Sequence, residues 1–136
     1  MTDQGPAPDD LARIVSFAMD CARDGQTELL GQYVDGGYPV DHPDAAGNTL
    51  LMLAAYHGHA GTVRMLLERG ADPDRLNDRG QSPVAGALFK GEDEVVRALV
   101  AAGADLDRGS PSGREAAAMF GTGHLLGDTP DTSGFS

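Results

Sequence analysis

Aromatic side chains are scarce in this chain of 136 residues, and tryptophan is absent. Aromatic residues make up 5% of the sequence, whereas glycine occurs 19 times and alanine is abundant. A core built on large rings is therefore excluded, and the many small side chains favour helices that approach one another closely. The length suits one domain with a modest core.

Basic residues are also few. Lys and Arg together number 10 against 21 Asp and Glu, which gives a formal net charge of −11. This charge opposes binding to the phosphate backbone of nucleic acids and to anionic membrane surfaces. We therefore expect no nucleic-acid partner and no membrane partner.

Cysteine is limited to Cys21, which excludes an internal disulfide. A single cysteine fits a reducing compartment, although a secreted protein with few cysteines is also compatible with it. No segment approaches the run of about 18 apolar residues that a membrane span needs. The N-terminal stretch MTDQGPAPDD is acidic and rich in proline, unlike a signal peptide. We expect a cytoplasmic location.

Internal repetition is the strongest signal in the sequence. Four sets of residues recur at a spacing of 33 positions: Gly25, Gly58 and Gly91; Gly37, Gly70 and Gly103; Gly47, Gly80 and Gly113; and Asp41, Asp74 and Asp107. Apolar and small residues keep the same step: Leu30, Val63 and Val96; Val34, Leu67 and Val100; and Cys21, Ala54 and Ala87. A period of this length indicates a stack of similar modules, each of which packs against its neighbours.

Each module is predicted to consist of a helix, a turn, a second helix and a loop. The run 50–55 is continuously apolar, and the run 63–67 places its apolar residues on one helical stripe. Thr49 and Ser82 stand where helix N-caps are needed, and Pro83 suits a first helical turn. Gly70 and Gly103 are expected to end the second helices. The stretches ADPDRLNDRG and ADLDRGSPSG are rich in turn residues, and their Asp-x-Asp pairs can bond their own backbone.

This module resembles the ankyrin repeat family. Residues 44–74, DAAGNTLLMLAAYHGHAGTVRMLLERGADPD, match the family pattern along almost their whole length, and residues 77–107 match it well. A divergent first repeat precedes them and the start of a fourth follows, so the resemblance covers residues 11–123. The tetrapeptide Thr-Pro-Leu-His of the family stands here as TLLM and SPVA. In the family, hydrogen bonds of this histidine usually tie neighbouring loops together. Both repeats lack the histidine here, so the resemblance does not imply this link between the loops.

The resemblance implies an all-α ankyrin-repeat solenoid of stacked helix–turn–helix modules with projecting β-turn-like loops. We expect a single domain over residues 11–126, with repeats at 11–43, 44–76 and 77–109 and a partial repeat at 110–126. Residues 1–10 and 127–136 are predicted to be flexible, and the end modules are predicted to act as polar caps. The protein is expected to be a monomer on its own.

No catalytic, metal or cofactor site is predicted, so we expect a protein that is not an enzyme. Cys21 falls in the column of small inner-helix residues, which predicts a buried and inert thiol. His57 and His59 lack the spacing of a helical zinc pair, and His59 stands where the family begins its second helix. The glycine-rich stretches lack the residues of a phosphate-binding loop, and DPDRLND lacks the Gly and Glu of a calcium loop.

Binding of another protein is the function that the pattern favours. In the family, the positions after the small-residue column and at the loop tips commonly contact partners, and aromatic residues in a polar rim suit an interface. The candidate contact residues are Arg23, Asp24, Ala45, Asn48, Tyr56, His57, Asp78, Arg79, Gln81, Phe89, Lys90, Ser112 and Arg114. We expect a non-catalytic interaction module that binds through its concave face and loop tips. The alternative is an accessory or inhibitory subunit that masks or regulates a partner enzyme. The net charge suggests a partner surface with basic patches.

Overall fold

The computed structural model describes residues 8–121, which contain seven helices and no strand. The helices are α1 (Pro8–Asp24), α2 (Thr27–Asp35), α3 (Leu50–Tyr56), α4 (Ala60–Glu68), α5 (Pro83–Lys90), α6 (Asp93–Ala101) and α7 (Gly113–Phe120). The flexible tail predicted at 127–136 lies outside the described residues. The flexible start predicted at 1–10 falls partly on α1, which begins at Pro8.

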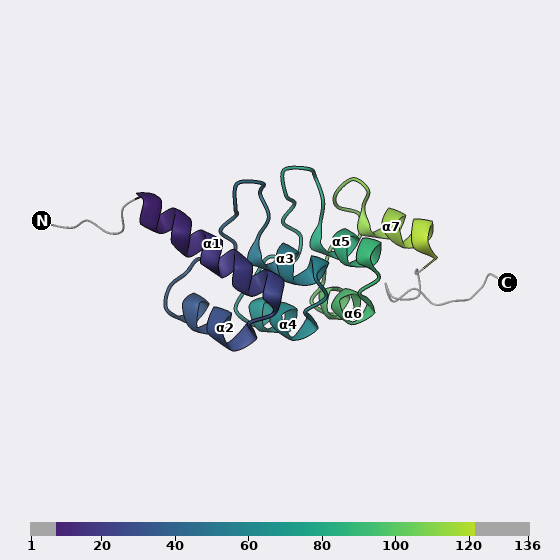
Figure 1. Ribbon diagram of the computed structural model, residues 1–136. Helices are drawn as coiled ribbons and strands as arrows, with labels where there is room; N and C mark the ends of the chain where they lie inside the picture. The colour runs from purple at the N-terminus through teal and green to yellow at the C-terminus, as the bar shows by residue number, and fades with distance from the viewer. Residues whose placement is uncertain (1–7, 122–136) are drawn as a thin grey trace, which may run out of the picture.

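The helices form two layers (Figure 1). The inner layer holds α1, α3, α5 and α7 in that order, and the outer layer holds α2, α4 and α6. Each outer helix packs against the inner helix that precedes it, and helices of one layer pack against their neighbours in the next repeat. The loops that join one pair to the next project from the same edge of the stack. This arrangement confirms the predicted all-α solenoid.

Local sequence sets where the inner helices begin. Thr49 Oγ1 accepts a hydrogen bond from Met52 N–H (3.2 Å), and Ser82 Oγ accepts one from Ala85 N–H (3.2 Å). Both caps were predicted, as was Pro83 in the first turn of α5. Past the outer helices, Gly70 and Gly103 have φ of +90° and +87°, the left-handed conformation that lets the chain leave a helix.

The hydrophobic core is a continuous layer of small and branched side chains between the inner and outer helices. Leu30, Val63 and Val96 each expose 0% of their surface, which confirms the predicted apolar column. Cys21 is 4% exposed, and Ala54 and Ala87 are fully buried. Side chains this small let adjacent inner helices approach closely.

The turns after the outer helices use the predicted Asp pairs. The N–H of Asp74 donates to Asp72 Oδ1 (2.9 Å), and the N–H of Asp107 donates to Asp105 Oδ1 (3.0 Å). These bonds explain why the Gly-Ala-Asp sequence occurs twice. Each of these two helix pairs is followed by a turn that an Asp side chain stabilises through a hydrogen bond to the backbone.

The fourth module departs from the 33-residue step. The N-caps of α3 and α5 are Thr49 and Ser82, but the N-cap of α7 is Ser112, only 30 residues after Ser82. The prediction that Gly113 repeats the loop glycines Gly47 and Gly80 is therefore wrong. Gly113 is the first residue of α7 and lies against α5, where an added Cβ would come within 2.7 Å of Val84 Cγ1.

Candidate functional site

Two adjoining hollows run along the inner helices beneath the projecting loops. Their volumes are about 330 and 460 Å³, and both are bordered by Met52, Tyr56, Arg79 and Gln81. We call the combined surface the inner groove. Its further lining residues are Arg23, Ala46, Asn48, Leu53, His57, Asn77, Ala85, Gly86, Phe89, Pro111, Ala116 and Met119.

One wall of the inner groove is made by the loop that joins α4 to α5. Asn77 Oδ1 accepts hydrogen bonds from the N–H groups of Arg79 and Gln81 (3.0 Å each), so this one amide shapes the turn that presents both residues. Asp44 has the equivalent role in the preceding repeat, where its Oδ1 accepts from Ala46 and Asn48 N–H at 2.8 and 2.9 Å.

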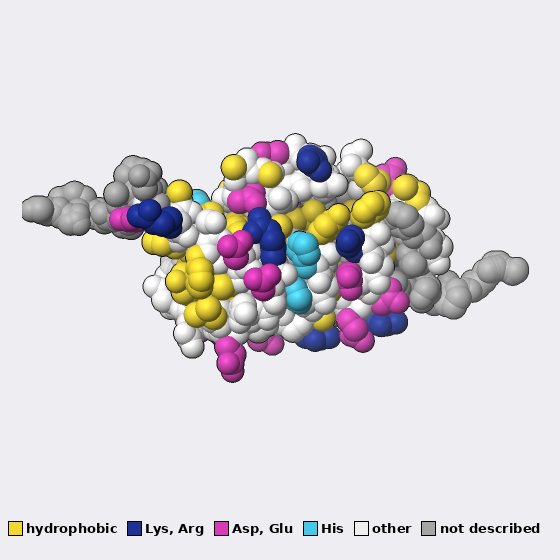
Figure 2. All heavy atoms as spheres, viewed as in Figure 1, with side chains coloured by type: hydrophobic (Ala, Val, Ile, Leu, Met, Phe, Trp, Pro, Cys, Tyr) yellow, Lys and Arg dark blue, Asp and Glu magenta, His cyan; other side chains and the backbone are white. Residues whose placement is uncertain are grey.

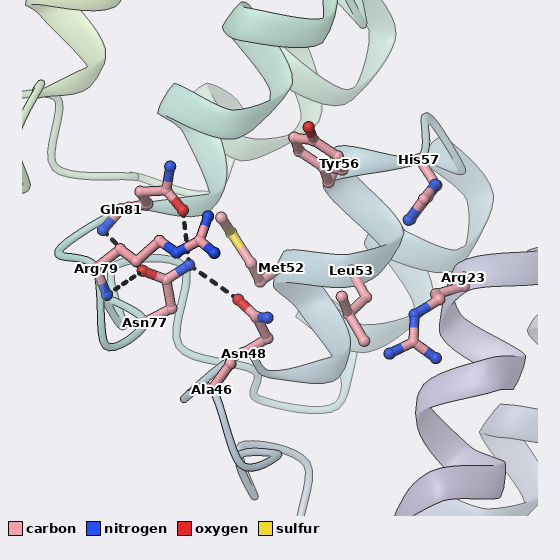
Figure 3. Close-up of a pocket in the computed structure, with 10 residues that line it drawn as sticks. All are labelled: Arg23, Ala46, Asn48, Met52, Leu53, Tyr56, His57, Asn77, Arg79 and Gln81. Carbon is pink, nitrogen blue, oxygen red and sulfur yellow. Dashed lines mark hydrogen bonds between the residues drawn. The ribbon is translucent and has the colours of Figure 1, made fainter.

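Side-chain amides tie the neighbouring loops together where the family uses histidine. Asn77 Nδ2 donates to Asn48 Oδ1 and to Gln81 Oε1, each over 2.9 Å (Figure 3). The N–H of Asp78 also donates to the carbonyl of Ala46 (3.0 Å). The loop wall is therefore connected across the repeat boundary, and hydrogen bonds hold the side chains of Asn48, Asn77 and Gln81 in place.

The floor of the inner groove comes from the last turns of the inner helices. Tyr56 is half-buried, Phe89 is 62% exposed and Met119 is 68% exposed. These three residues occupy the same place, seven positions after the N-cap of their helices. Gly86 lies beside them, and a Cβ there would press on Met52 Cε at 3.3 Å. The result is a row of large apolar side chains on consecutive repeats.

Basic and imidazole groups border this apolar row. The Lys90 ammonium lies 5.0 Å from the centre of the Tyr56 ring, a cation–π contact. The His57 ring meets the same tyrosine edge-on at 5.5 Å, and Arg23 reaches the groove from α1 (Figure 3). Figure 2 shows hydrophobic side chains as a band below the loops, with basic, acidic and histidine side chains beside it.

The second histidine of the HGH sequence has a different place. His59 is the N-cap residue of α4, as predicted, and its Nε2 donates to the carbonyl of Arg23 over 2.7 Å. Its ring lies against Gly25, where a Cβ would stand 2.6 Å from Nδ1. His59 is thus a link between repeats rather than a ligand pair with His57. Within residues 8–121, no group of three or more His, Cys, Asp or Glu side chains is arranged to hold a metal ion.

The predicted contact residues divide into two groups. Seven line the inner groove and an eighth, Lys90, lies beside it; the seven are Arg23, Asn48, Tyr56, His57, Arg79, Gln81 and Phe89. The others lie elsewhere. Ala45 lines a third hollow between α1 and the loop 42–46, while Asp24 and Asp78 are exposed outside the three hollows.

The last two predicted contacts, Ser112 and Arg114, belong to the start of α7. Ser112 is 5% exposed; its Oγ accepts from Glu115 N–H (3.1 Å), and its own N–H donates to Glu115 Oε1 (2.8 Å). This capping box makes Ser112 a helix cap, so we withdraw it from the candidate contacts. Arg114 pairs with Asp107 at 3.2 Å, away from the inner groove.

Sequence reasoning missed Met52, Asn77, Gly86 and Met119. Met119 lies 30 rather than 33 residues after Phe89, so a fixed step overlooks it, although counting from the helix caps finds it. Met52 stands at the family's histidine position, which marks it as a side chain that faces the loops. No simple signal marks Asn77 or Gly86, because their roles depend on contacts across repeats.

The repeated helix pairs, the projecting loops and the groove between them define a repeat protein of the solenoid class. The family model for ankyrin repeats (3 copies) matches residues 18–110. The chain therefore belongs to the ankyrin repeat family.

Several curated proteins are similar to part of the chain. An ankyrin repeat protein of Pseudomonas aeruginosa is 45% identical over 68 residues, which cover 48% of this chain and 39% of that protein. Ankyrin repeat domain-containing protein 29 of Homo sapiens is 43% identical over 60 residues, or 43% of this chain and 20% of that protein. An ankyrin repeat-containing protein of Treponema pallidum is 38% identical over 63 residues, or 46% and 21%. Each match thus spans well under half of the relative's length.

Ankyrin repeats are generally modules for protein–protein interaction, and the family is generally non-catalytic. Within the described residues, no helix combines the length and the apolar composition that crossing a bilayer requires.

Proposed function

We propose that this chain is a monomeric, non-catalytic module that binds another protein in the inner groove. The observation that carries the proposal is the exposure of Phe89 and Met119, at 62% and 68%, in one row on adjacent repeats. Large apolar side chains exposed side by side are typical of a surface that binds another protein.

The surroundings of this row support a protein ligand. Asn48, Gln81 and Arg79 supply polar groups along the loop wall, so a partner's backbone and polar side chains find hydrogen-bonding groups beside the apolar floor. An apolar centre with a polar rim is the usual anatomy of a protein interface. The loop wall is already tied by Asn77, which reduces the ordering cost of binding.

The proposal is tested by affinity capture from native cells with the double variant Phe89→Ala/Met119→Ala. We expect this variant to stay folded, since both side chains are mostly exposed, and to lose a partner that the wild type retains. A matched control is Leu11→Ala/Leu29→Ala, which truncates side chains that are 50% and 36% exposed outside the inner groove. Equal recovery of the partner by wild type and by the groove variant would contradict the proposal.

The regulatory alternative uses the same surface and needs one more measurement. If the captured partner is an enzyme, its activity is assayed with and without the chain. A masking role predicts inhibition by the wild type that Phe89→Ala/Met119→Ala relieves. An unchanged activity leaves the chain as a docking module only.

A further inference from the structure

The inner groove has a local charge opposite in sign to that of the whole chain. The formal net charge is −11. Among the described residues that line the two hollows, however, there is no Asp or Glu, whereas Arg23 and Arg79 are both present. Lys90, the one lysine in the sequence, stands directly beside them on the Tyr56 ring.

Basic side chains away from the groove are mostly neutralised by neighbours. Ion pairs join Arg69 to Asp35, Arg64 and Arg97 to Glu94, Arg114 to Asp107 and Arg13 to Asp10.

The cations of the groove differ. Within the described residues, no carboxylate lies within 4.0 Å of the Arg79 guanidinium or the Lys90 ammonium. Arg23 does pair with Asp20 at 2.7 Å, but their side chains are 42% and 60% exposed. An exposed pair of this kind contributes little and exchanges readily.

Two acids lie close to the groove but outside both hollows. Asp78 belongs to the loop wall, where its carboxylate lies beside Gly47 of the neighbouring loop, and Asp44 is already engaged by backbone groups. Asp44 lines the third hollow, next to the groove, and its Oδ1 accepts hydrogen bonds from Ala46 and Asn48 N–H. Its charge is therefore partly compensated by backbone dipoles. Over the short distances of a docked segment, local charges outweigh the net charge, because salt screens charges more than about 10 Å apart.

We propose that the inner groove binds an acidic segment of a partner protein, one that carries apolar side chains among Asp and Glu residues. The inference rests on the proposed function and specifies the chemistry of its ligand. The apolar side chains cover Phe89 and Met119, while the carboxylates approach Arg79, Lys90 and, after exchange with Asp20, Arg23. It replaces the expectation, drawn from net charge alone, of a basic partner surface.

A single-stranded nucleic acid is the other ligand considered, because its phosphates could approach the basic side chains and its bases could stack on the aromatic ones. The net charge of −11 disfavours it, because a polyphosphate is longer than the groove and meets the acidic surface around it. A nucleic-acid ligand is therefore an outcome that the experiment must be able to reveal.

The test selects peptides from a random 12-residue phage library against the full-length chain. We expect enrichment of peptides that combine Asp or Glu with Leu, Ile, Phe or Tyr. Selected peptides are then synthesised with a fluorescent label, and their Kd is measured by anisotropy. Arg79→Glu/Lys90→Glu is expected to weaken binding about tenfold or more at low salt. Arg75→Glu/Arg97→Glu changes the net charge equally outside the groove and is expected to leave Kd within about twofold.

The outcomes separate the inference from the proposed function. Enriched peptides that are basic or uncharged, or that bind Arg79→Glu/Lys90→Glu as tightly as wild type, overturn the acidic ligand. If such peptides still lose binding to Phe89→Ala/Met119→Ala, the groove remains the docking site. Peptides insensitive to that variant count against both proposals. Enrichment of no peptide, or tighter binding of labelled oligo(dT) than of the best peptide, also contradicts the inference.

Discussion

Asp74 Oδ1 accepts a hydrogen bond from the backbone N–H of Asp105 over 2.6 Å, across the boundary between two repeats. In the preceding repeat, Asp41 Oδ1 accepts from the N–H of Asp72 over 3.0 Å. The Asp column that recurs every 33 residues is thus a ladder that joins each exit turn to the next. The same residues that shape a turn also fix its distance from its neighbour.

Replacement of Asp74 by Ala removes the acceptor between two repeats. We expect the free energy of unfolding to fall by about 1 kcal/mol, the usual net value of one such bond. Asp107→Ala is the matched control, because Asp107 stands in the same column but accepts from the Arg114 side chain instead of a following turn. Urea unfolding followed by circular dichroism measures both. An equal loss in the two variants would contradict the ladder.

The ion pair between Asp35 and Arg69 joins α2 to α4 and is expected to make stability depend on pH. Two hydrogen bonds link them, Nε to Oδ1 (2.8 Å) and Nη2 to Oδ2 (3.0 Å). The hydrogen bond to Arg69, helped by the guanidinium charge, lowers the pKa of the Asp35 carboxyl. Because the folded pKa is depressed, the stabilisation is present above the unfolded value and is lost as pH falls through the folded one.

Asp35→Asn should therefore lower the urea midpoint at neutral pH, and its difference from wild type should disappear as pH falls through the lowered pKa of the folded Asp35 carboxyl. Because both partners are on the surface, the effect is small and declines with added salt. Arg69→Gln should behave alike, and the double variant should lose no more than either single one. A midpoint difference that persists at low pH would show that the pair is not its cause.

Cys21 is predicted to resist alkylation in the folded protein. Its side chain is 4% exposed, and burial, with smaller contributions from Asp20 and Asp24, raises the pKa of its thiol. The low exposure limits access of the alkylating reagent, and the raised pKa lowers the fraction of reactive thiolate. Iodoacetamide labelling read by mass spectrometry should be slow in buffer and fast in unfolding urea. As a control, Ser16→Cys in a Cys21→Ala background places an exposed thiol on the same helix. If Cys21 of the folded wild type were labelled as fast as this exposed thiol, the prediction of a buried thiol would be contradicted.

Ser112→Ala is expected to loosen α7 without a loss of intrinsic groove affinity. The substitution removes one half of the capping box with Glu115, which costs about 1 kcal/mol in a typical helix. Amide hydrogen exchange in α7 should quicken, whereas exchange in α3 and α5 should not. Ser110→Ala, at an exposed position just before the cap, should leave α7 unchanged. Unaltered exchange in Ser112→Ala would return this residue to the candidate contacts.

Most of the fold could be predicted from the sequence because residues with the same structural role recur at equivalent positions in successive repeats. Thr49 and Ser82 show the helix starts, and the small residues at 21, 54 and 87 show where helices touch. A constant spacing of 33 residues predicts the wrong register for the fourth module, because the connection before α7 is three residues shorter than the one before α5. Helix caps, rather than spacing, determine the register there, and they also place Ala117 in the buried column.

The candidate site was predictable only to a degree, for a different reason. Tyr56 and Phe89 follow from their shared place after the small-residue column. The link from Asn77 to Asn48 crosses a repeat boundary, and periodicity describes single repeats rather than contacts between them. Likewise, net charge averages over the whole surface, so the absence of acids among the described residues that line the inner groove becomes visible only once the chain is folded.

The most direct test of the account is a photo-cross-linking scan across the two layers. A benzophenone amino acid is placed at position 89 or 119 in the inner groove, or at position 64 or 97 on the outer helices, and the chain is irradiated with its captured partner. We expect cross-links to that partner from positions 89 and 119 and none above background from 64 and 97. Efficient cross-linking from the outer helices alone would place the interface on the opposite layer and contradict the account.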